Sequence, residues 1–223
     1  MIEILIADDH PIVRQGLRSA FSDTCDIHVR GEAADGSQAL AIARQEAFDV
    51  ILLDLAMPLM NGLDVLKEIM LEKPKSHVLI LSAYSDKHYA VRCFRAGAMG
   101  YITKECATTE FVQAIRRVNL GRKYVSASLA QQLVDETDLD SQRPLHETLS
   151  DREFQVLCLL GQGKSVTESA KILNLGIPTV STYRARILDK MKLRSTAQLI
   201  VYALEHKLIS NVYADSPLPS SPR

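Results

Sequence analysis

The chain has 223 residues and a formal net charge of −1, from 26 Lys and Arg residues against 27 Asp and Glu residues. Such a length favours two domains with separate hydrophobic cores over a single domain. No apolar stretch approaches the roughly 18 uninterrupted residues that a membrane span needs. The start of the chain, Met1-Ile2-Glu3, lacks the basic segment of a secretory signal. We therefore expect a cytoplasmic protein with no membrane partner.

Apolar runs and amphipathic segments alternate through the first half of the chain. Runs typical of buried parallel strands occur at Ile4–Ala7, Val50–Leu53, Val78–Leu81 and Gly100–Thr103. Helical spacing is found over Pro11–Phe21, Ser37–Ala47, Gly62–Glu72, Lys87–Arg95, and from Thr108 or Thr109 to about Leu120. This alternation predicts an α/β fold over residues 1–123, with a doubly wound, five-stranded parallel sheet of order 2-1-3-4-5.

Carboxylates follow two strands that this order makes neighbours. Asp54 ends the run Val50–Leu53, and Asp8 and Asp9 directly follow the first strand. A lone Asp after a strand is often only a turn residue or a helix cap. Three acids at adjacent strand ends repel one another unless a cation neutralises them or one is protonated. Carboxylate oxygens suit Mg²⁺, which in turn binds phosphate oxygens, so the pattern indicates phosphoryl chemistry.

Two further strand ends carry groups that bind phosphate. Ser82 follows Val78–Leu81, and Lys104 follows Gly100–Thr103. A hydroxyl can donate to a phosphoryl oxygen, and an ammonium can neutralise it as a compact charge. Ser82 alone could equally be a turn residue at the end of a strand.

This ordered set of residues resembles the receiver domain of two-component response regulators over residues 1 to 123. The resemblance implies that Asp54 accepts a phosphoryl group and that Asp8 and Asp9 form the acidic pair, with Asp9 the more direct Mg²⁺ ligand. Ala56 would offer Mg²⁺ its backbone carbonyl.

The same resemblance gives roles to three residues on the fourth and fifth strands. Ser82 matches the switch hydroxyl, Tyr101 the aromatic residue that moves with it, and Lys104 the cationic partner of the phosphoryl group. Tyr101 alone could be an ordinary half-buried strand residue. One departure is Lys104-Glu105, where many receivers have Lys-Pro, so a cis peptide bond at this point is not assured.

Four cysteines are widely separated along the chain: Cys25, Cys93, Cys106 and Cys158. They form no Cys-x-x-Cys pair. This spacing favours reduced thiols over a zinc site or a disulfide framework.

Residues 124–146 have the composition of a linker, with a possible short helix at Leu129–Val134 followed by an acidic and polar stretch. Residues 126–147 carry 1 Lys or Arg against 5 Asp and Glu, a net −4, whereas residues 148–209 carry 9 against 5, a net +4. Positive charge is thus concentrated near the C-terminal end. The Ser- and Pro-rich residues 210–223 cannot bury a core, and we expect them to be disordered.

Residues 147–209 predict four short helices. Ser150 with Glu153 and Ser165 with Glu168 are capping-box pairs that begin the first two helices, which end near Gly161 and Leu173. A longer helix runs from Ile177 or Pro178 to about Lys192, and a fourth from Ser195 to about Lys207. Four short helices around a tight turn indicate an all-α helix-turn-helix domain.

This segment resembles the LuxR-type DNA-binding domain. The resemblance is carried by Leu149-Ser150-x-Arg152-Glu153, Gly161-x-Gly163-x-Ser165 and Thr179-Val180-Ser181-Thr182-Tyr183-Arg184. Two departures are Val166-Thr167-Glu168-Ser169-Ala170 in place of the usual Asn-Lys-Glu-Ile-Ala, and Ser181 at a position that is often Lys. Together with the receiver, the chain resembles a response regulator of the NarL/FixJ type.

A helical wheel divides the third helix into two faces. Val180, Ile187 and Met191 cluster on the side that faces a core. The opposite arc is expected to face the major groove of DNA: Ser181, Thr182, Ala185 and Arg186. Phosphate contacts are assigned to the basic residues of this helix and its end, each of which could instead be a solvated charge: Arg184, Arg186, Lys190 and Lys192.

The resemblance implies a transcriptional regulator rather than a turnover enzyme. Its expected partners are a sensor histidine kinase, promoter DNA bound as a homodimer, and RNA polymerase. Two alternatives remain open at this point. An aspartate-nucleophile phosphatase also uses a strand-end Asp and Mg²⁺, but typically has a second Asp where this chain has Ala56. A DNA-binding protein that does not depend on phosphorylation could use the receiver only as a dimerisation scaffold.

Overall fold

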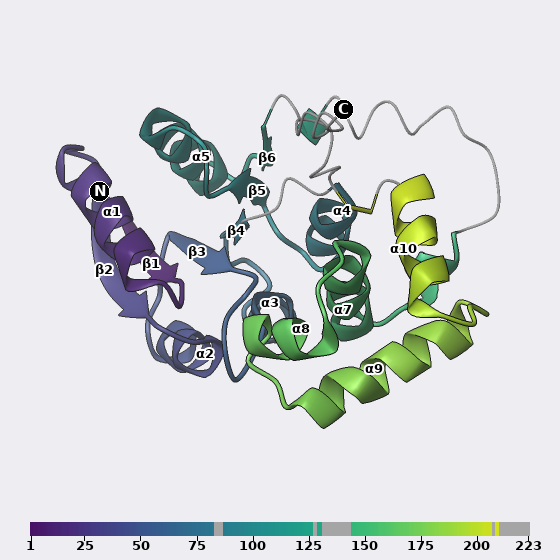
Figure 1. Ribbon diagram of the computed structural model, residues 1–223. Coiled ribbons are helices and arrows are strands. Elements are labelled where there is room, and N and C mark those ends of the chain that lie inside the picture. The colour runs from purple at the N-terminus through teal and green to yellow at the C-terminus, as the bar shows by residue number, and fades with distance from the viewer. Residues whose placement is uncertain (83–86, 127–128, 131–143, 207, 210–223) are drawn as a thin grey trace, which may run out of the picture. The chain divides into compact units, whose positions relative to one another are not determined.

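The computed structural model describes residues 1–82, 87–126, 129–130, 144–206 and 208–209. The chain divides into two compact units, residues 1–140 and residues 141–223 (Figure 1). Most of the predicted helix Leu129–Val134, nearly all of the acidic linker and the whole C-terminal tail lie outside the described residues. Within the described part, no helix is long and apolar enough to cross a membrane.

The first unit is built on a parallel sheet with the strand order β2-β1-β3-β4-β5-β6. Its strands are β1 (Ile2–Ala7), β2 (Ile27–Ala33), β3 (Val50–Asp54), β4 (Val78–Ser82), β5 (Gly100–Thr103) and β6 (Tyr124–Val125). The order confirms the predicted 2-1-3-4-5 arrangement for the first five strands. The apolar runs become strands because both faces of the sheet are covered, so β3 and β4 are buried along their whole length.

The sixth strand corrects the predicted count of five. Tyr124 and Val125 pair in parallel with Gly100 and Tyr101 at the edge of the sheet. Both strand residues are half-buried, and two residues are too few to show any periodicity. The strand therefore exists because of its tertiary pairing, which a local pattern does not reveal.

Helices alternate with these strands as expected. They are α1 (Pro11–Ser22), α2 (Gly36–Gln45), α3 (Gly62–Glu72), α4 (Lys87–Arg95) and α5 (Thr108–Asn119). α1 and α5 pack on one face of the sheet, where Phe21 and Ile115 join a single core cluster with strand residues such as Leu52 (Figure 1). α2 packs against α3, beside the sheet. This double winding leaves the carboxyl ends of β1, β3, β4 and β5 together at one edge.

The second unit is helical. It contains a short 3₁₀ helix, η1 (Leu145–Thr148), and the helices α7 (Asp151–Gly161), α8 (Val166–Ile172), α9 (Ile177–Lys190) and α10 (Thr196–Glu205). Both predicted capping boxes are present, at the starts of α7 and α8. Phe154, Val180 and Leu199 are fully buried and come from three different helices, so the unit has a core of its own.

Candidate functional site

The acidic residues converge at the carboxyl edge of the sheet. β1 and β3 pair side by side, with Ala7 opposite Leu53, so the residues that follow both strands meet. Asp8 is 0% and Asp54 1% exposed. Oxygen atoms of Asp8, Asp9 and Asp54, together with a ring nitrogen of His10, all lie within 4.8 Å of one another. The sequence placed three of these residues at strand ends, and the structure brings them together.

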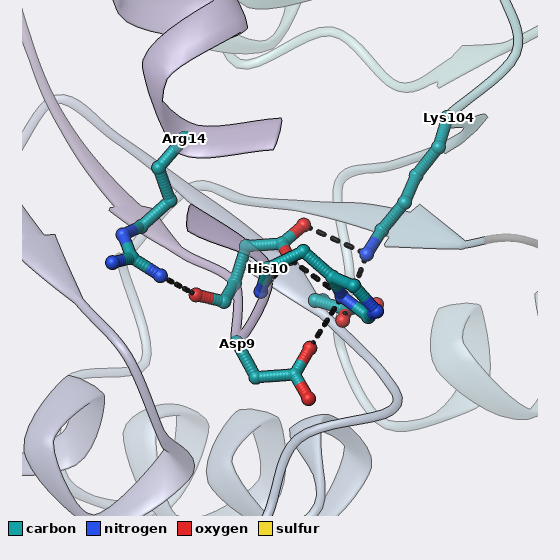
Figure 2. Close-up of polar contacts among 6 residues, drawn as sticks. Asp9, His10, Arg14 and Lys104 are labelled. Atoms are coloured by element: carbon teal, nitrogen blue, oxygen red, sulfur yellow. Dashed lines mark hydrogen bonds and ion pairs between the residues drawn. The ribbon is translucent and has the colours of Figure 1, made fainter. Parts of the chain in front are cut away.

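Lys104 closes this cluster from the end of β5. Its Nζ lies 2.7 Å from Asp8 Oδ2 and 2.9 Å from Asp54 Oδ2. Figure 2 shows the Lys104 side chain reaching across toward Asp9 and His10. The backbone N–H of Lys104 donates to the carbonyl of Ser82 at 2.8 Å, so the pairing of β4 with β5 sets where this side chain starts. One ammonium is thus placed against two buried carboxylates.

The protonation equilibria of the cluster follow from burial and from these charges. Burial raises the pKa of Asp54 above its ordinary value; attraction to Lys104 lowers it, nearby Asp8 raises it further, and the net shift is upward. Burial alone would lower the pKa of Lys104, but Asp54 and Asp8 outweigh burial and raise it. Lys104 is therefore a fixed positive charge, whereas ionising Asp54 is costly.

The donor atoms suit a hard cation. Three carboxylate oxygens are buried at this point: Asp8 Oδ2, Asp9 Oδ1 and Asp54 Oδ2. The second of these lies 2.6 Å from His10 Nδ1. The first and third lie at ion-pair distance from Lys104, but a single ammonium does not satisfy the lone pairs of both carboxylates. Buried oxygens from three acids at one point are ligands of the kind that Mg²⁺ takes in proteins. A backbone hydrogen bond from Ala56 to Asp54 places the main chain of Ala56 beside the same carboxylate.

His10 and Arg14 belong to this site although the sequence interpretation did not single them out. The N–H of His10 donates to Asp8 Oδ1 at 2.8 Å, and His10 Nδ1 lies 2.6 Å from Asp9 Oδ1. Arg14, on the first turn of α1, donates through Nη1 to the carbonyl of Asp8 at 2.6 Å (Figure 2). For His10 the available signal was its position directly after the acidic pair, but only the fold shows which way His10 and Arg14 turn.

Ser82 ends the strand beside Asp54, whereas Tyr101 lies one strand further away on β5, opposite Ile80 of β4. Asp54 pairs with Leu81 across β3 and β4, so Ser82 is one residue beyond that pair. Ser82 is 1% and Tyr101 0% exposed, and both make interactions within the protein. The position of Ser82 agrees with a place beside Asp54, while the roles of Ser82 and Tyr101 as switch residues stay predictions.

The loop after β3 folds back tightly on Asp54. The N–H of Gly62 donates to the carbonyl of Leu55 at 3.1 Å. A Cβ atom at Gly62 would lie 1.9 Å from the carbonyl oxygen of Asp54, which no side chain can occupy. Asn61, which is fully buried, then begins α3 by accepting from the N–H of Asp64 at 2.9 Å. The Asn-Gly pair therefore fixes the backbone around Asp54.

The candidate DNA-binding residues lie on α9 in the second unit. Val180, Ile187 and Met191 are buried, as the helical wheel predicts. The residues of the opposite arc are exposed: Ser181, Thr182, Ala185 and Arg186. The hydroxyl of Thr182 donates to the carbonyl of Pro178 at 2.9 Å, so Thr182 offers its methyl group and an acceptor oxygen outward.

The basic residues of α9 differ in how they are engaged. Arg184 donates through Nε to Thr196 Oγ1 at 2.8 Å, which ties α9 to the start of α10. Lys190 Nζ lies 2.7 Å from Glu153 Oε2, and Glu153 is 3% exposed. Lys192 is exposed, beyond the end of the helix. Whether any of them contacts phosphate stays a prediction.

Comparisons with known families agree with this division of the chain. A family model described as the response regulator receiver domain matches residues 4–116. A second, described as bacterial regulatory proteins of the luxR family, matches residues 147–203. Each match falls within one of the two compact units.

Characterised relatives match along nearly the whole chain. Response regulator UvrY of Escherichia coli is 33% identical over 209 residues, which cover 93% of this chain and 96% of that protein. Response regulator GacA of Pseudomonas aeruginosa is 33% identical over 210 residues, covering 94% and 98%. Transcriptional regulatory protein LiaR of Bacillus subtilis is 33% identical over 211 residues, covering 94% and 100%.

Solved structures with the same organisation are also similar. A complex of the two-component response regulator RcsB with DNA has a TM-score of 0.58 and 26% identity, and covers 91% of this chain and 98% of that one. A structure of two RcsB dimers bound to two parallel DNAs has a TM-score of 0.57 at the same identity and coverage.

Proposed function

The chain belongs to the two-component response regulators that join a receiver domain to a LuxR-type helix-turn-helix domain, and we propose that phosphorylation of its Asp54 controls its binding to promoter DNA. The observation that carries this proposal is the cluster of Asp8, Asp54 and Lys104 at the carboxyl edge of the sheet, with Lys104 Nζ within 2.9 Å of both carboxylates. The phosphoryl donor would be a histidine kinase, the family's usual partner.

Asp54 supplies the nucleophile. One of its carboxylate oxygens forms the new bond to phosphorus, while the bond between phosphorus and the imidazole nitrogen of the kinase breaks and the imidazole leaves with the electron pair. Lys104 is already positioned within ion-pair reach to neutralise charge on the transferred group. Because the fold holds these residues in place before the donor arrives, catalysis is largely a matter of position and electrostatics.

We propose Mg²⁺ as the cofactor, held by Asp8, Asp9 and Asp54 with the backbone carbonyl of Ala56. When bound, Mg²⁺ would screen the repulsion between the carboxylates and the incoming phosphoryl oxygens. The convergence of oxygen atoms from all three acids within 4.8 Å supports this assignment. The burial of Asp54 excludes bulk water from its carboxylate, which strengthens each of these charge interactions.

The phosphoryl group would then attract the hydroxyl of Ser82, and Tyr101 would move with it. In this state the receiver would favour a homodimer that binds DNA through α9. To move an equilibrium between two states from 1:99 to 99:1, the modified site must favour one state by roughly 5.5 kcal/mol. Charge-assisted hydrogen bonds of about 1.5–3 kcal/mol each make two to four new contacts sufficient. RNA polymerase is the proposed downstream partner. The proposed phosphoryl chemistry takes place on Asp54 of the protein itself and is not the turnover of a substrate.

Labelling by acetyl phosphate tests the assignment of Asp54. The wild-type chain should gain one phosphoryl group in the presence of Mg²⁺, seen as a mass increase, and Asp54→Asn should gain none. Asp49→Asn is a matched control, because Asp49 lies just before the opposite end of the same strand. Equal labelling of Asp54→Asn and the wild type would refute the proposal.

A further inference from the structure

Arg14 is placed to control where the acidic pair lies. Its guanidinium donates to the main-chain carbonyl of Asp8 at 2.6 Å. That carbonyl belongs to the peptide unit that joins Asp8 to Asp9. Because a peptide unit is planar and rigid, holding its oxygen also sets the direction in which Asp9 leaves the main chain. A side chain of α1 thus fixes the orientation of the residue that carries Asp9 Oδ1.

Arg14 is itself held from the neighbouring strand. Its Nε lies 3.4 Å from Glu32 Oε2, and only 17% of the Arg14 side chain is exposed. Glu32 is the register partner of Ile6 across β1 and β2, so its carboxylate is positioned by the sheet. The planar fork of the guanidinium can hold Glu32 and the carbonyl of Asp8 at the same time. The sheet, Arg14 and the loop after β1 therefore form one connected support.

From these contacts we propose that Arg14 is a positioning residue for the Mg²⁺ and phosphoryl site, acting through the Asp8–Asp9 peptide. This inference rests on the proposed function of Asp54, and it adds a residue that touches neither the metal ligands' side chains nor the phosphoryl group. The other contacts of Asp8 remain without Arg14: its N–H donates to Ala33 at 3.1 Å, and its carboxylate pairs with Lys104. Loss of Arg14 should loosen the placement of Asp9 while the fold is retained.

Electrostatics alone predicts the opposite change in Mg²⁺ affinity, so the two explanations can be distinguished by experiment. Arg14→Gln removes a positive charge beside a cation site, so weaker Coulombic repulsion by itself would tighten Mg²⁺ binding. Positioning predicts weaker binding, by about 10-fold or more, the range seen when partners that orient metal ligands are removed. Arg18→Gln is the matched control, because Arg18 lies one turn further along α1, pairs with the same Glu32 and carries the same charge.

The experiment is a titration of the metal-free full chain with MgCl₂, followed by the NMR amide signals and without any phosphoryl donor. Arg14→Gln should raise the Mg²⁺ dissociation constant about 10-fold or more, while Arg18→Gln leaves it unchanged or lower. The unfolding midpoints of both variants should agree. With acetyl phosphate added, Arg14→Gln should need more Mg²⁺ for half-maximal labelling, with little loss of rate at saturating Mg²⁺.

Equal Mg²⁺ affinity of the two variants would overturn the inference and leave the proposed function intact. If the wild-type chain bound no Mg²⁺, the proposed metal site and this inference would fail together. Should Arg14→Gln not fold, Arg14→Lys carries the test, since it keeps the charge but loses the fork. Positioning then predicts weaker Mg²⁺ binding than in the wild type, and equal binding contradicts it.

Discussion

The carboxylate of Asp54 is almost completely buried, and this burial makes the stability of the protein depend on pH. Burial raises the pKa of Asp54 in the folded state, and Lys104 offsets this only in part. A group with a raised folded pKa holds its proton more tightly in the folded than in the unfolded chain. Stability therefore falls as pH rises from the ordinary Asp range, roughly pH 4, through the raised pKa. At neutral pH the ionised Asp54 lowers the free energy of unfolding.

Asp54→Asn should accordingly stabilise the metal-free protein at neutral pH, because it replaces a buried charge with a neutral group of the same shape. We expect a gain of roughly 0.5–2 kcal/mol, the usual size of a stabilising substitution. Urea unfolding with a chelator present, at pH 7.5 and near pH 4, measures it. The difference between variant and wild type should shrink at the lower pH. A variant that is less stable than the wild type at pH 7.5 would contradict this account of the site.

Gly62 gives a second prediction at the residue scale. A Cβ atom there would come within 1.9 Å of the Asp54 carbonyl oxygen, and that oxygen is backbone rather than a mobile side chain. Gly62→Ala should therefore displace the loop around Asp54, destabilise the first unit by about 1–3 kcal/mol and slow labelling by acetyl phosphate. Gly16→Ala on α1 is the control, since nothing lies within 4 Å of its Cβ position. That control should be neutral or stabilising by up to about 1 kcal/mol. Equal stability of the two variants would argue against this steric reading.

The sequence predicted those residues of the candidate site that directly follow a strand, because the ends of the strands could themselves be predicted. Asp8, Asp54 and Lys104 each follow an apolar run, and parallel strands bring such residues to one edge. Arg14 follows no such rule, because its role depends on which way a helical side chain turns. Its partner is a main-chain carbonyl, which has no signature in the sequence. The roles given to Ser82 and Tyr101 stay predictions, since burial alone does not reveal movement.

Elements with a local physical cause were predicted well. Ser150 and Ser165 begin α7 and α8 through capping boxes, and α3 has the predicted bounds, Gly62–Glu72. α2 begins one residue earlier than expected, because Asp35 caps it by accepting from the N–H of Gln38. It ends two residues earlier than expected, because the backbone becomes extended at Glu46. β6 was missed because it has two residues and depends on pairing with β5.

The contact between Lys190 and Glu153 joins the C-terminal turn of α9 to the N-terminus of α7. Burial alone would raise the pKa of Glu153, but the hydrogen bonds from Lys190 and Ser150 outweigh burial, so the pKa of Glu153 is lowered. This contribution to stability is present above the ordinary Glu pKa and is lost as pH falls through the lowered folded pKa. Lys190 therefore has a structural task besides any contact with phosphate.

Lys190→Gln should destabilise the second unit by about 1–2 kcal/mol, because Glu153 keeps its charge but loses its cationic partner. Lys192→Gln, two positions further on and exposed, should change stability by less than about 0.5 kcal/mol. Thermal unfolding of both variants at pH 7 measures the difference. The deficit of Lys190→Gln should narrow in acid, where Glu153 is protonated in both proteins. If both variants unfolded at the same temperature as the wild type, the ion pair between Lys190 and Glu153 would contribute nothing to stability.

At the scale of the whole molecule, positive charge is concentrated in one segment rather than spread evenly along the chain. The net charge of −1 conceals a C-terminal segment, residues 148–209, with a net +4. DNA affinity that rests on such positive charge should be strongly salt-dependent. The proposed phosphoryl site lies in the other unit, so control of DNA binding by that site would require coupling between two separately folded cores.

Operator binding with and without beryllofluoride tests that coupling. Beryllofluoride on Asp54 mimics the phosphoryl group, and we expect it to raise operator affinity about 5- to 150-fold, the range of typical coupling free energies. Asp54→Asn should bind DNA but ignore beryllofluoride, whereas Asp49→Asn should respond like the wild type. The salt slope should stay nearly constant if each subunit keeps the same phosphate contacts, and should steepen if the activated chain binds as a dimer. Equal affinity with and without beryllofluoride would favour the alternative in which the receiver is only a dimerisation scaffold, because a ligand without differential affinity shifts no equilibrium.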